Sequence, residues 1–161
     1  MEKERREFFE KLKKSGRIKD VSEAFKEFPP EEEWHKGDAS NFFLEETEKY
    51  GEYEIGDIVF VKEYKYSNGL KGKDHLFVII EKDNYAVPIE YFAMLISSHT
   101  EKLKFSANKF LIRNQLNNLH RDSIVKTDEI YKIKNENILF KIGKVEKESV
   151  EEYKKNLEKL F

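Results

Sequence analysis

The feature that most constrains the fold is a series of short apolar runs, rich in β-branched and aromatic residues, that begins after Gly51. Runs of this composition are typical of β-strands, and turn-forming residues such as Asn68 and Gly69 separate them. Their close spacing predicts an antiparallel, meandering sheet that curls into a small barrel. We expect strands over residues 57–61, 75–80, 85–89, 92–97, 123–127, 130–133 and 138–142.

The first 50 residues have helical rather than strand periodicity. Phe8, Phe9 and Leu12 recur at helical spacing among charged residues, which predicts a helix over residues 2–14. Prolines can end a helix, and the same spacing recurs before Pro29. A second helix is therefore expected over residues 21–28. A third is expected over residues 40–50.

The end of the chain predicts one more helix. Its apolar residues share one helical face among Glu and Lys, and they are Val150, Tyr153, Leu157 and Leu160. We expect this helix to pack on the barrel. Acidic residues outnumber basic ones in residues 1–50, whereas basic residues are in excess over residues 51–144. The predicted fold class is therefore mainly β (α+β), with a helical N-terminal extension over residues 1–50 and a barrel domain over residues 51–161.

Composition limits the function further. The 161 residues fit one compact domain with an extension, and the net charge of −2 means that any attraction to nucleic acid must be local. The absence of cysteine excludes a disulfide scaffold, a thiol nucleophile and a zinc ribbon. The charged start does not read as a signal peptide, and no stretch approaches the roughly 20 apolar residues of a membrane span. We therefore expect a cytoplasmic protein that does not contact membranes.

Several short motifs follow one another in the second region. They are Gly-Asp-Ile-Val at 56–59, a glycine-rich loop at 68–73, a hydrophobic strand at 77–80, Leu-Ile-Ser-Ser at 95–98, Asp-Glu-Ile at 128–130 and Ile-Gly-Lys-Val at 142–145. In this order the chain resembles the PemK/MazF family of toxin–antitoxin ribonucleases over about residues 55–160. The resemblance implies a small SH3-like barrel closed by a C-terminal helix, a homodimer, an antitoxin partner, and metal-independent cleavage of single-stranded RNA.

The reaction of that family requires a base for the ribose 2′-OH, groups that stabilise the charge on the phosphate, and an acid for the leaving 5′ oxygen. Family members commonly place Arg-Pro at the start of the second strand, where this chain has Asp74 and His75. The resemblance therefore implies catalytic roles for His75, for Ser97 at the family's Thr position, and for the neighbouring cation Lys73. An unperturbed imidazole titrates at about pH 6.5, so a histidine can serve as base or acid.

The same residues also have structural interpretations. His75 fits a strand-edge histidine bonded to backbone, Lys73 a solvated lysine, and Ser97 the end of a strand. Because an aspartate at the arginine position inverts a charge beside the phosphate, the alternative function is a catalytically inert barrel that binds RNA or a protein partner.

A basic stretch between residues 101 and 127 supplies candidate RNA contacts, since cations interleaved with Phe105 and Phe110 can track phosphates and stack bases. Lys126 belongs to this stretch, which can equally be a chance run with core phenylalanines. The predicted RNA-binding residues are Ser98, Lys102, Lys104, Lys109, Arg113 and Arg121. The histidines lack a metal-ligand spacing and no phosphate loop occurs, so neither metal nor cofactor is expected.

Two expectations about packing complete the sequence reading. Alternation along the predicted strands places six residues in one barrel core, namely Ile58, Phe60, Phe77, Ile79, Val125 and Ile142. The N-terminal extension has apolar helical faces that need a surface to bury against. We expect it to pack on the flank of the barrel, with a cover over the basic stretch as the alternative.

Overall fold

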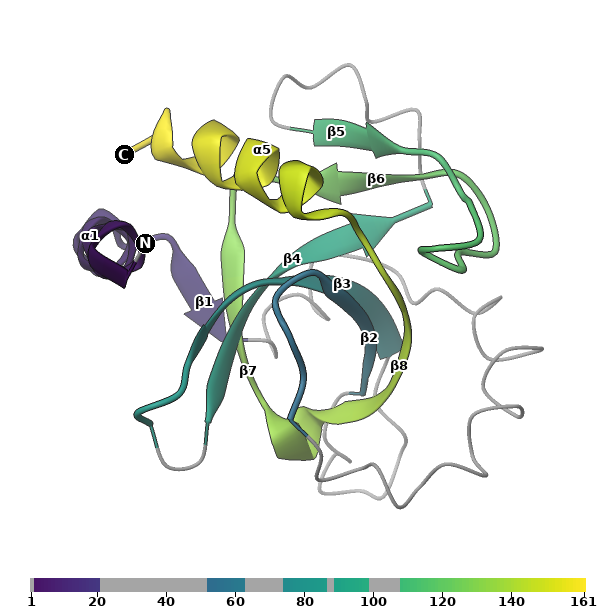
Figure 1. The fold of residues 1–161 in the computed structure, drawn as a ribbon, viewed down its shortest axis with the longest axis horizontal. Helices are drawn as coiled ribbons and strands as arrows, with labels where there is room; N and C mark the ends of the chain where they lie inside the picture. Colours follow the sequence, from purple (N-terminus) through teal and green to yellow (C-terminus); the bar gives the residue numbers. More distant parts are fainter. Residues whose placement is uncertain (1, 21–51, 63–73, 87–88, 99–107) are drawn as a thin grey trace, which may run out of the picture.

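The computed structural model describes residues 2–20, 52–62, 74–86, 89–98 and 108–161. The strands form one strongly curved sheet, with α1 beside it and α5 lying across it (Figure 1). In chain order the elements are α1 (Glu2–Ser15), β1 (Ile18–Asp20), β2 (Asp57–Lys62), β3 (Asp74–Asp83), β4 (Glu90–Ser97), β5 (Asn108–Leu111), β6 (Ser123–Lys126), β7 (Ile130–Lys134), the 3-10 turn η3 (Asn135–Asn137), β8 (Ile138–Lys144) and α5 (Lys147–Glu158). The mixed α+β class is confirmed as an eight-strand sheet with helices at both ends.

The sheet divides at β4. Its main path has the order β1-β7-β4-β3-β2-β8, and every pairing is antiparallel except the parallel pair of β1 with β7. The edge of β4 opposite β3 pairs first with β7, through Glu90 to Ala93, and then with β6, through Ile96 and Ser97. Because β5 pairs in turn with β6, the sheet has a second arm. It consists of β5, β6 and the end of β4.

Side chains along β2 and β3 alternate between two buried faces of the sheet. Ile58 pairs with Val78 on the face that packs against both helices, whereas Val59 pairs with Phe77 on the other face. The prediction of a single core is therefore wrong. Ile58, Phe60, Val125 and Ile142 belong to the cluster under the helices, and Phe77 and Ile79 belong to the second cluster.

The predicted strand over residues 85–89 is also wrong. β3 continues to Asp83, whose Oδ1 accepts the backbone N–H of Tyr85 at 3.0 Å. Asn84 and Tyr85 form a turn, in which the Tyr85 side chain is 88% exposed, and β4 begins only at Glu90. Tyr85 and Ala86, at the start of this run, thus belong to the turn after β3, because an aspartate that bonds a nearby backbone N–H favours a turn.

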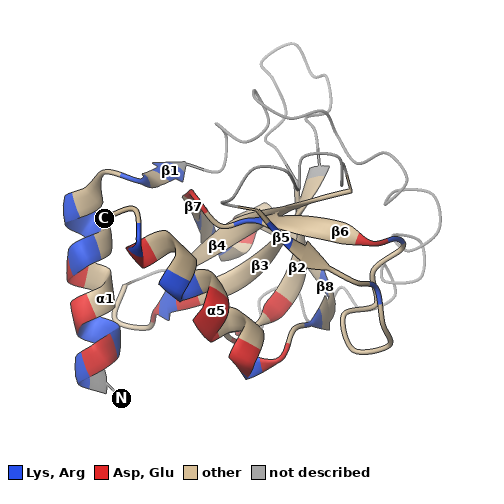
Figure 2. Cartoon of the chain, turned by 90° about the horizontal axis from the view of Figure 1, so that it is seen from above, with Lys and Arg blue, Asp and Glu red and all other residues tan. Residues whose placement is uncertain are grey.

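The two terminal helices fit their sequence patterns with one exception. Helix α1 buries Phe8 and Leu12 in the cluster that also holds Val150 and Tyr153 of α5. Both helices are rich in Lys, Arg, Asp and Glu, whereas the strands consist mostly of uncharged residues (Figure 2). Leu160 lies beyond the end of α5 and is exposed, contrary to expectation. Residues 2–20 therefore pack on the flank of the sheet as expected, while the helices predicted over 21–28 and 40–50 lie outside the described residues.

Two glycines of the sequence motifs are required by close backbone contacts. Gly56 has φ of +97°, a conformation that favours glycine, and its N–H and C=O bond Ile79 and Val145 at 2.7 and 2.8 Å. At Gly143, an added Cβ would lie 2.3 Å from the backbone oxygen of Asn117. These glycines let the start of β2 and the end of β8 approach neighbouring backbone closely.

Candidate functional site

Strand register brings two of the predicted catalytic residues together. β3 and β4 pair Leu76 with Ile96 and Phe77 with Leu95. Continuing this antiparallel register by one step places His75 opposite Ser97, at the last position of β4. Directly opposed residues have Cβ atoms about 4.5–5.5 Å apart and point to the same face. The histidine and the serine are therefore cross-strand neighbours.

Both side chains are almost fully enclosed. His75 is 1% exposed and Ser97 is 4% exposed. They lie on the face of the second core cluster, since His75 pairs with Val61 of that cluster and Phe77 follows two residues later. An imidazole beside a hydroxyl can exchange protons and bond a phosphate oxygen. In this conformation, however, both side chains expose too little surface for a bulky substrate to contact them.

A cation and an aromatic ring share this face of the sheet. Ser97 pairs with Ile124 of β6, and Ile124 pairs with Phe110 of β5, whose ring is partly exposed. Lys126 follows Ile124 by two residues and so points to the same side, where it is half-buried. Lys126 was visible in the basic stretch, but only the strand register shows that it faces the same side as His75 and Ser97.

Lys109 points the other way. It pairs with Val125, whose side chain lies in the cluster under the helices. Its ammonium is 3.1 Å from a carboxylate oxygen of Glu152 on α5. The structure therefore separates Lys109 from the face that carries His75 and Ser97.

Two predicted RNA-binding arginines lie in the loop between β5 and β6. The Arg113 guanidinium donates to the backbone oxygen of His120 at 3.1 Å, and the Arg113 backbone N–H donates to Asp122 Oδ1 at 2.9 Å. Arg121 is exposed in the same loop. The chain re-enters β6 one residue before Ile124, the partner of Ser97. Arg113 and Arg121 are thus held at the end of the arm that carries Ser97.

The remaining predicted residues are less informative. Ser98 is half-buried in a bend directly after β4, and Lys73, Lys102 and Lys104 lie outside the described residues.

Among the residues that the structure describes, no three metal-binding side chains gather into a group. Within the same part of the chain, no helix has the length and hydrophobicity needed to cross a membrane.

The chain matches a known protein family over most of its length. A family model described as "PemK-like, MazF-like toxin of type II toxin-antitoxin system" matches residues 54–161, about two thirds of the chain. The matched part holds the strands from β2 to β8 together with α5, and it leaves out α1 and β1. No curated protein matches the chain. The resemblance inferred from the order of the motifs is confirmed.

Proposed function

Because the chain belongs to the PemK-like, MazF-like toxin family of type II toxin–antitoxin systems, we propose that it is a metal-independent endoribonuclease that cleaves single-stranded RNA. The observation that carries this proposal is the pairing of Leu76 with Ile96, because the same register continued by one step brings His75 opposite Ser97. Single-stranded RNA is the substrate because attack by the 2′-OH needs an unstacked backbone that can align with the leaving oxygen. The proposal includes an SH3-like barrel over residues 51–161, the extension over 1–50, and a homodimer.

In the proposed reaction, His75 takes the proton of the ribose 2′-OH, and the 2′ oxygen attacks the phosphorus. The bond from phosphorus to the 5′ oxygen breaks, and that oxygen receives a proton from an acid, the role that imidazolium can fill. The Ser97 hydroxyl donates to a phosphate oxygen, while Lys126 and Lys73 supply positive charge. The products are a 2′,3′-cyclic phosphate and a 5′-hydroxyl.

Two observations favour the alternative, an inert barrel that binds RNA or a protein partner. The side chains of His75 and Ser97 are enclosed, so catalysis would require the site to open. The position that holds the family's arginine is Asp74. Binding by the exposed loop with Arg113 and Arg121 requires neither His75 nor Ser97.

We expect purified protein to cleave labelled single-stranded RNA in the presence of a chelator and to leave a 2′,3′-cyclic phosphate. His75→Ala and Ser97→Ala should each lower the cleavage rate by about 10²-fold or more, because each removes a group from the reacting centre. His120→Ala is the matched control, since His120 is exposed in the loop between β5 and β6, and it should cleave at the normal rate.

Two results would contradict the proposal. Tight RNA binding without cleavage supports the inert barrel. Cleavage that stops on addition of chelator shows that the reaction depends on a metal ion and follows another mechanism.

A further inference from the structure

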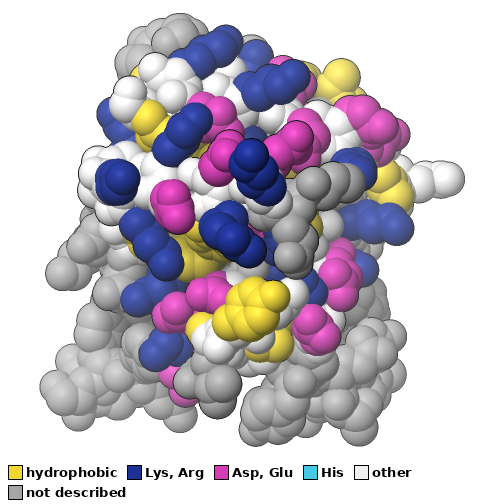
Figure 3. Space-filling view, turned by 60° about the vertical axis from the view of Figure 1, so that its left-hand side comes forward, with side chains coloured by type: hydrophobic (Ala, Val, Ile, Leu, Met, Phe, Trp, Pro, Cys, Tyr) yellow, Lys and Arg dark blue, Asp and Glu magenta, His cyan; other side chains and the backbone are white. Residues whose placement is uncertain are grey.

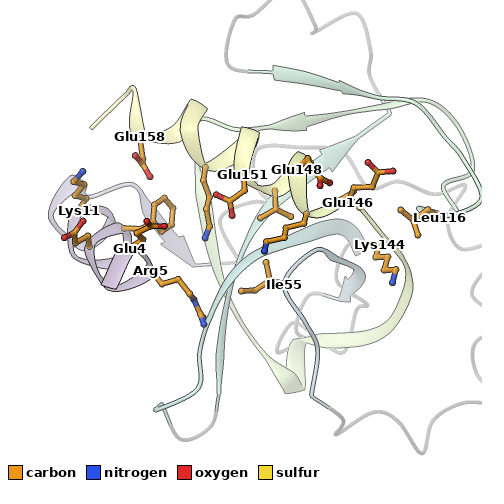
Figure 4. Close-up of a pocket in the computed structure, with 16 residues that line it drawn as sticks. Glu4, Arg5, Lys11, Ile55, Leu116, Lys144, Glu146, Glu148, Glu151 and Glu158 are labelled. Carbon is orange, nitrogen blue, oxygen red and sulfur yellow. The ribbon is translucent and has the colours of Figure 1, made fainter. Parts of the chain in front are cut away.

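A cleft separates the two terminal helices. Its volume is about 880 Å³, and it is bounded by α1, α5 and the chain that leads into α5 (Figure 4). In Figure 1, α1 is seen end-on while α5 lies across the page, so the helices cross steeply and leave an open angle between them. The family match begins at residue 54, so the α1 wall of this cleft lies outside the part that the family model describes.

The floor of the cleft is apolar. It is made by Phe8 from α1, Ile55 before β2, Val145 just before α5, Val150 in the first turn of α5, and Leu116 from the loop between β5 and β6. Leu116 is 38% exposed at one end of the floor. On the face shown in Figure 3, hydrophobic patches lie among side chains of both charges. A partner can therefore bury apolar side chains here only if it also meets the charged rim.

The rim carries an excess of negative charge. Two cations of the lining, Arg5 and Lys154, are bonded to the buried Glu81, whose single charge offsets one of them, and the other does not cancel the excess of acids on the rim. The exposed cations are Lys11, Lys144 and Lys147, and the exposed acids are Glu4, Glu7, Glu146, Glu148, Glu151 and Glu158. Charge complementarity therefore requires a positively charged occupant.

The lining also distinguishes a peptide from a small polar ligand. All its side chains are either apolar or charged, without a hydroxyl, amide or imidazole. Small-molecule sites usually contain a few fixed polar groups that orient the ligand. An apolar centre with a charged rim is instead the arrangement of a protein interface.

We propose that the cleft between α1 and α5 is a docking site for the antitoxin, and that it takes a segment with large apolar side chains flanked by Lys or Arg. The proposal rests on membership of the toxin family and does not depend on RNA cleavage. The walls are fixed before binding, because Phe8 and Leu12 anchor α1 in the core and Arg5 joins it to β3. A preformed site loses less conformational entropy when it binds.

The experiment measures binding of three synthetic peptides to the full chain by fluorescence anisotropy. The first alternates Leu with Lys and Arg, the second replaces each Leu with Ser, and the third replaces each Lys and Arg with Glu. The first peptide should bind saturably and at least about tenfold tighter than the other two, because it alone satisfies both the floor and the rim. Amide shifts of the labelled protein on titration should map to α1 and α5.

Paired variants locate the binding. Glu148→Lys with Glu151→Lys should weaken the first peptide about tenfold, whereas the control Glu10→Lys with Glu136→Lys, equal in charge and outside the cleft, should not. Leu116→Ser should weaken it, whereas Ile112→Ser should not, although Ile112 is 62% exposed.

The proposal is overturned if the Ser peptide or the Glu peptide binds as well as the first, or if the control variants weaken binding as much as the cleft variants. It is also overturned if the chain self-associates and Leu116→Ser abolishes that association, because a second copy is then the occupant. Cleavage assays on the same proteins separate the two proposals. Loss of cleavage with normal peptide binding contradicts only the proposed nuclease.

Discussion

Each end of β3 buries a polar side chain, but the two side chains have different neighbours. Glu81, near the end of the strand, is completely enclosed and accepts from Arg5 Nε and from Lys154 Nζ, each at 2.8 Å. His75, near the start, pairs with Val61 of β2 and lies one register step before the pair of Leu76 with Ile96. Glu81 joins α1 and α5 to the sheet, whereas His75 lies on the face of the sheet that also carries Ser97 and Lys126.

A break in the strand register produces this difference. The pairing of β3 with β4 shifts between Ile79 and Glu81, so that Glu81 pairs with Phe92, a residue of the cluster under the helices. Strict alternation would have placed Glu81 on the same face as His75 and Phe77. Bulges redirect side chains in this way. Here the redirected carboxylate meets one cation from α1 and one from α5, and Lys154 also lies 5.1 Å from the centre of the Phe8 ring.

The comparison predicts that removing Glu81 has the largest effect on stability. Glu81→Ala should lower the free energy of unfolding by about 3–5 kcal/mol, because Lys154 and Arg5 lose the anion that compensates their burial. Denaturant unfolding measures this, with the exposed Glu136→Ala as control. RNA cleavage per folded molecule should stay normal. An unfolding midpoint equal to that of the unaltered chain would show that Glu81 does not stabilise the attachment of the two helices to the sheet.

Alkaline pH tests the packing of α5 near the same end of β3. Burial, together with the charge of Glu152, raises the pKa of Tyr153 to about 12, and this outweighs the lowering by the hydrogen bond with Ser149. The unfolded tyrosine ionises near its ordinary pKa of 10. The stability that buried, protonated Tyr153 contributes is therefore fully present below pH 10 and is lost as the pH rises toward 12. The loss from this group is about 2–3 kcal/mol.

Comparison with Tyr153→Phe isolates that contribution, and urea unfolding at pH 9, 10 and 11 measures it. Burial lowers the pKa of Lys82, but hydrogen bonds to Glu52 and Glu54 outweigh it and the pKa lies above 10.5. Lys82 is present in both proteins, so its contribution cancels in the difference. Parallel pH profiles for the two proteins would show that Tyr153 is not buried in solution.

The smallest effect is expected for the outer partner of Glu81. Arg5→Ala should cost only about 1 kcal/mol, because the arginine is partly exposed and Lys154 still compensates the carboxylate. Arg6→Ala is the matched control on the exposed side of α1. Hydrogen exchange should become faster in α1 for Arg5→Ala and remain unchanged for Arg6→Ala. Equal effects of the two changes would mean that Arg5 does not help to hold the helix on the sheet.

Local patterns in the sequence determined much of this protein. Helical spacing around Phe8 and Leu12 gave α1, and short apolar runs gave β2, β3, β4, β6, β7 and β8 to within a few residues. The order of the motifs was enough to predict the family and to select His75 and Ser97. These signals can be read from sequence because each depends on residues close together in the chain.

Only the tertiary structure decided which distant residues meet. The three-residue β1 pairs with β7 more than 100 positions away, and β5 is a short strand in a stretch interpreted as basic surface. One shift in register sends Glu81 to the helices, and one step of alternation turns Lys109 away from Ser97 and divides Phe77 from Phe60. Periodicity specifies that a strand has two faces, but the long-range pairing of strands decides what each face touches.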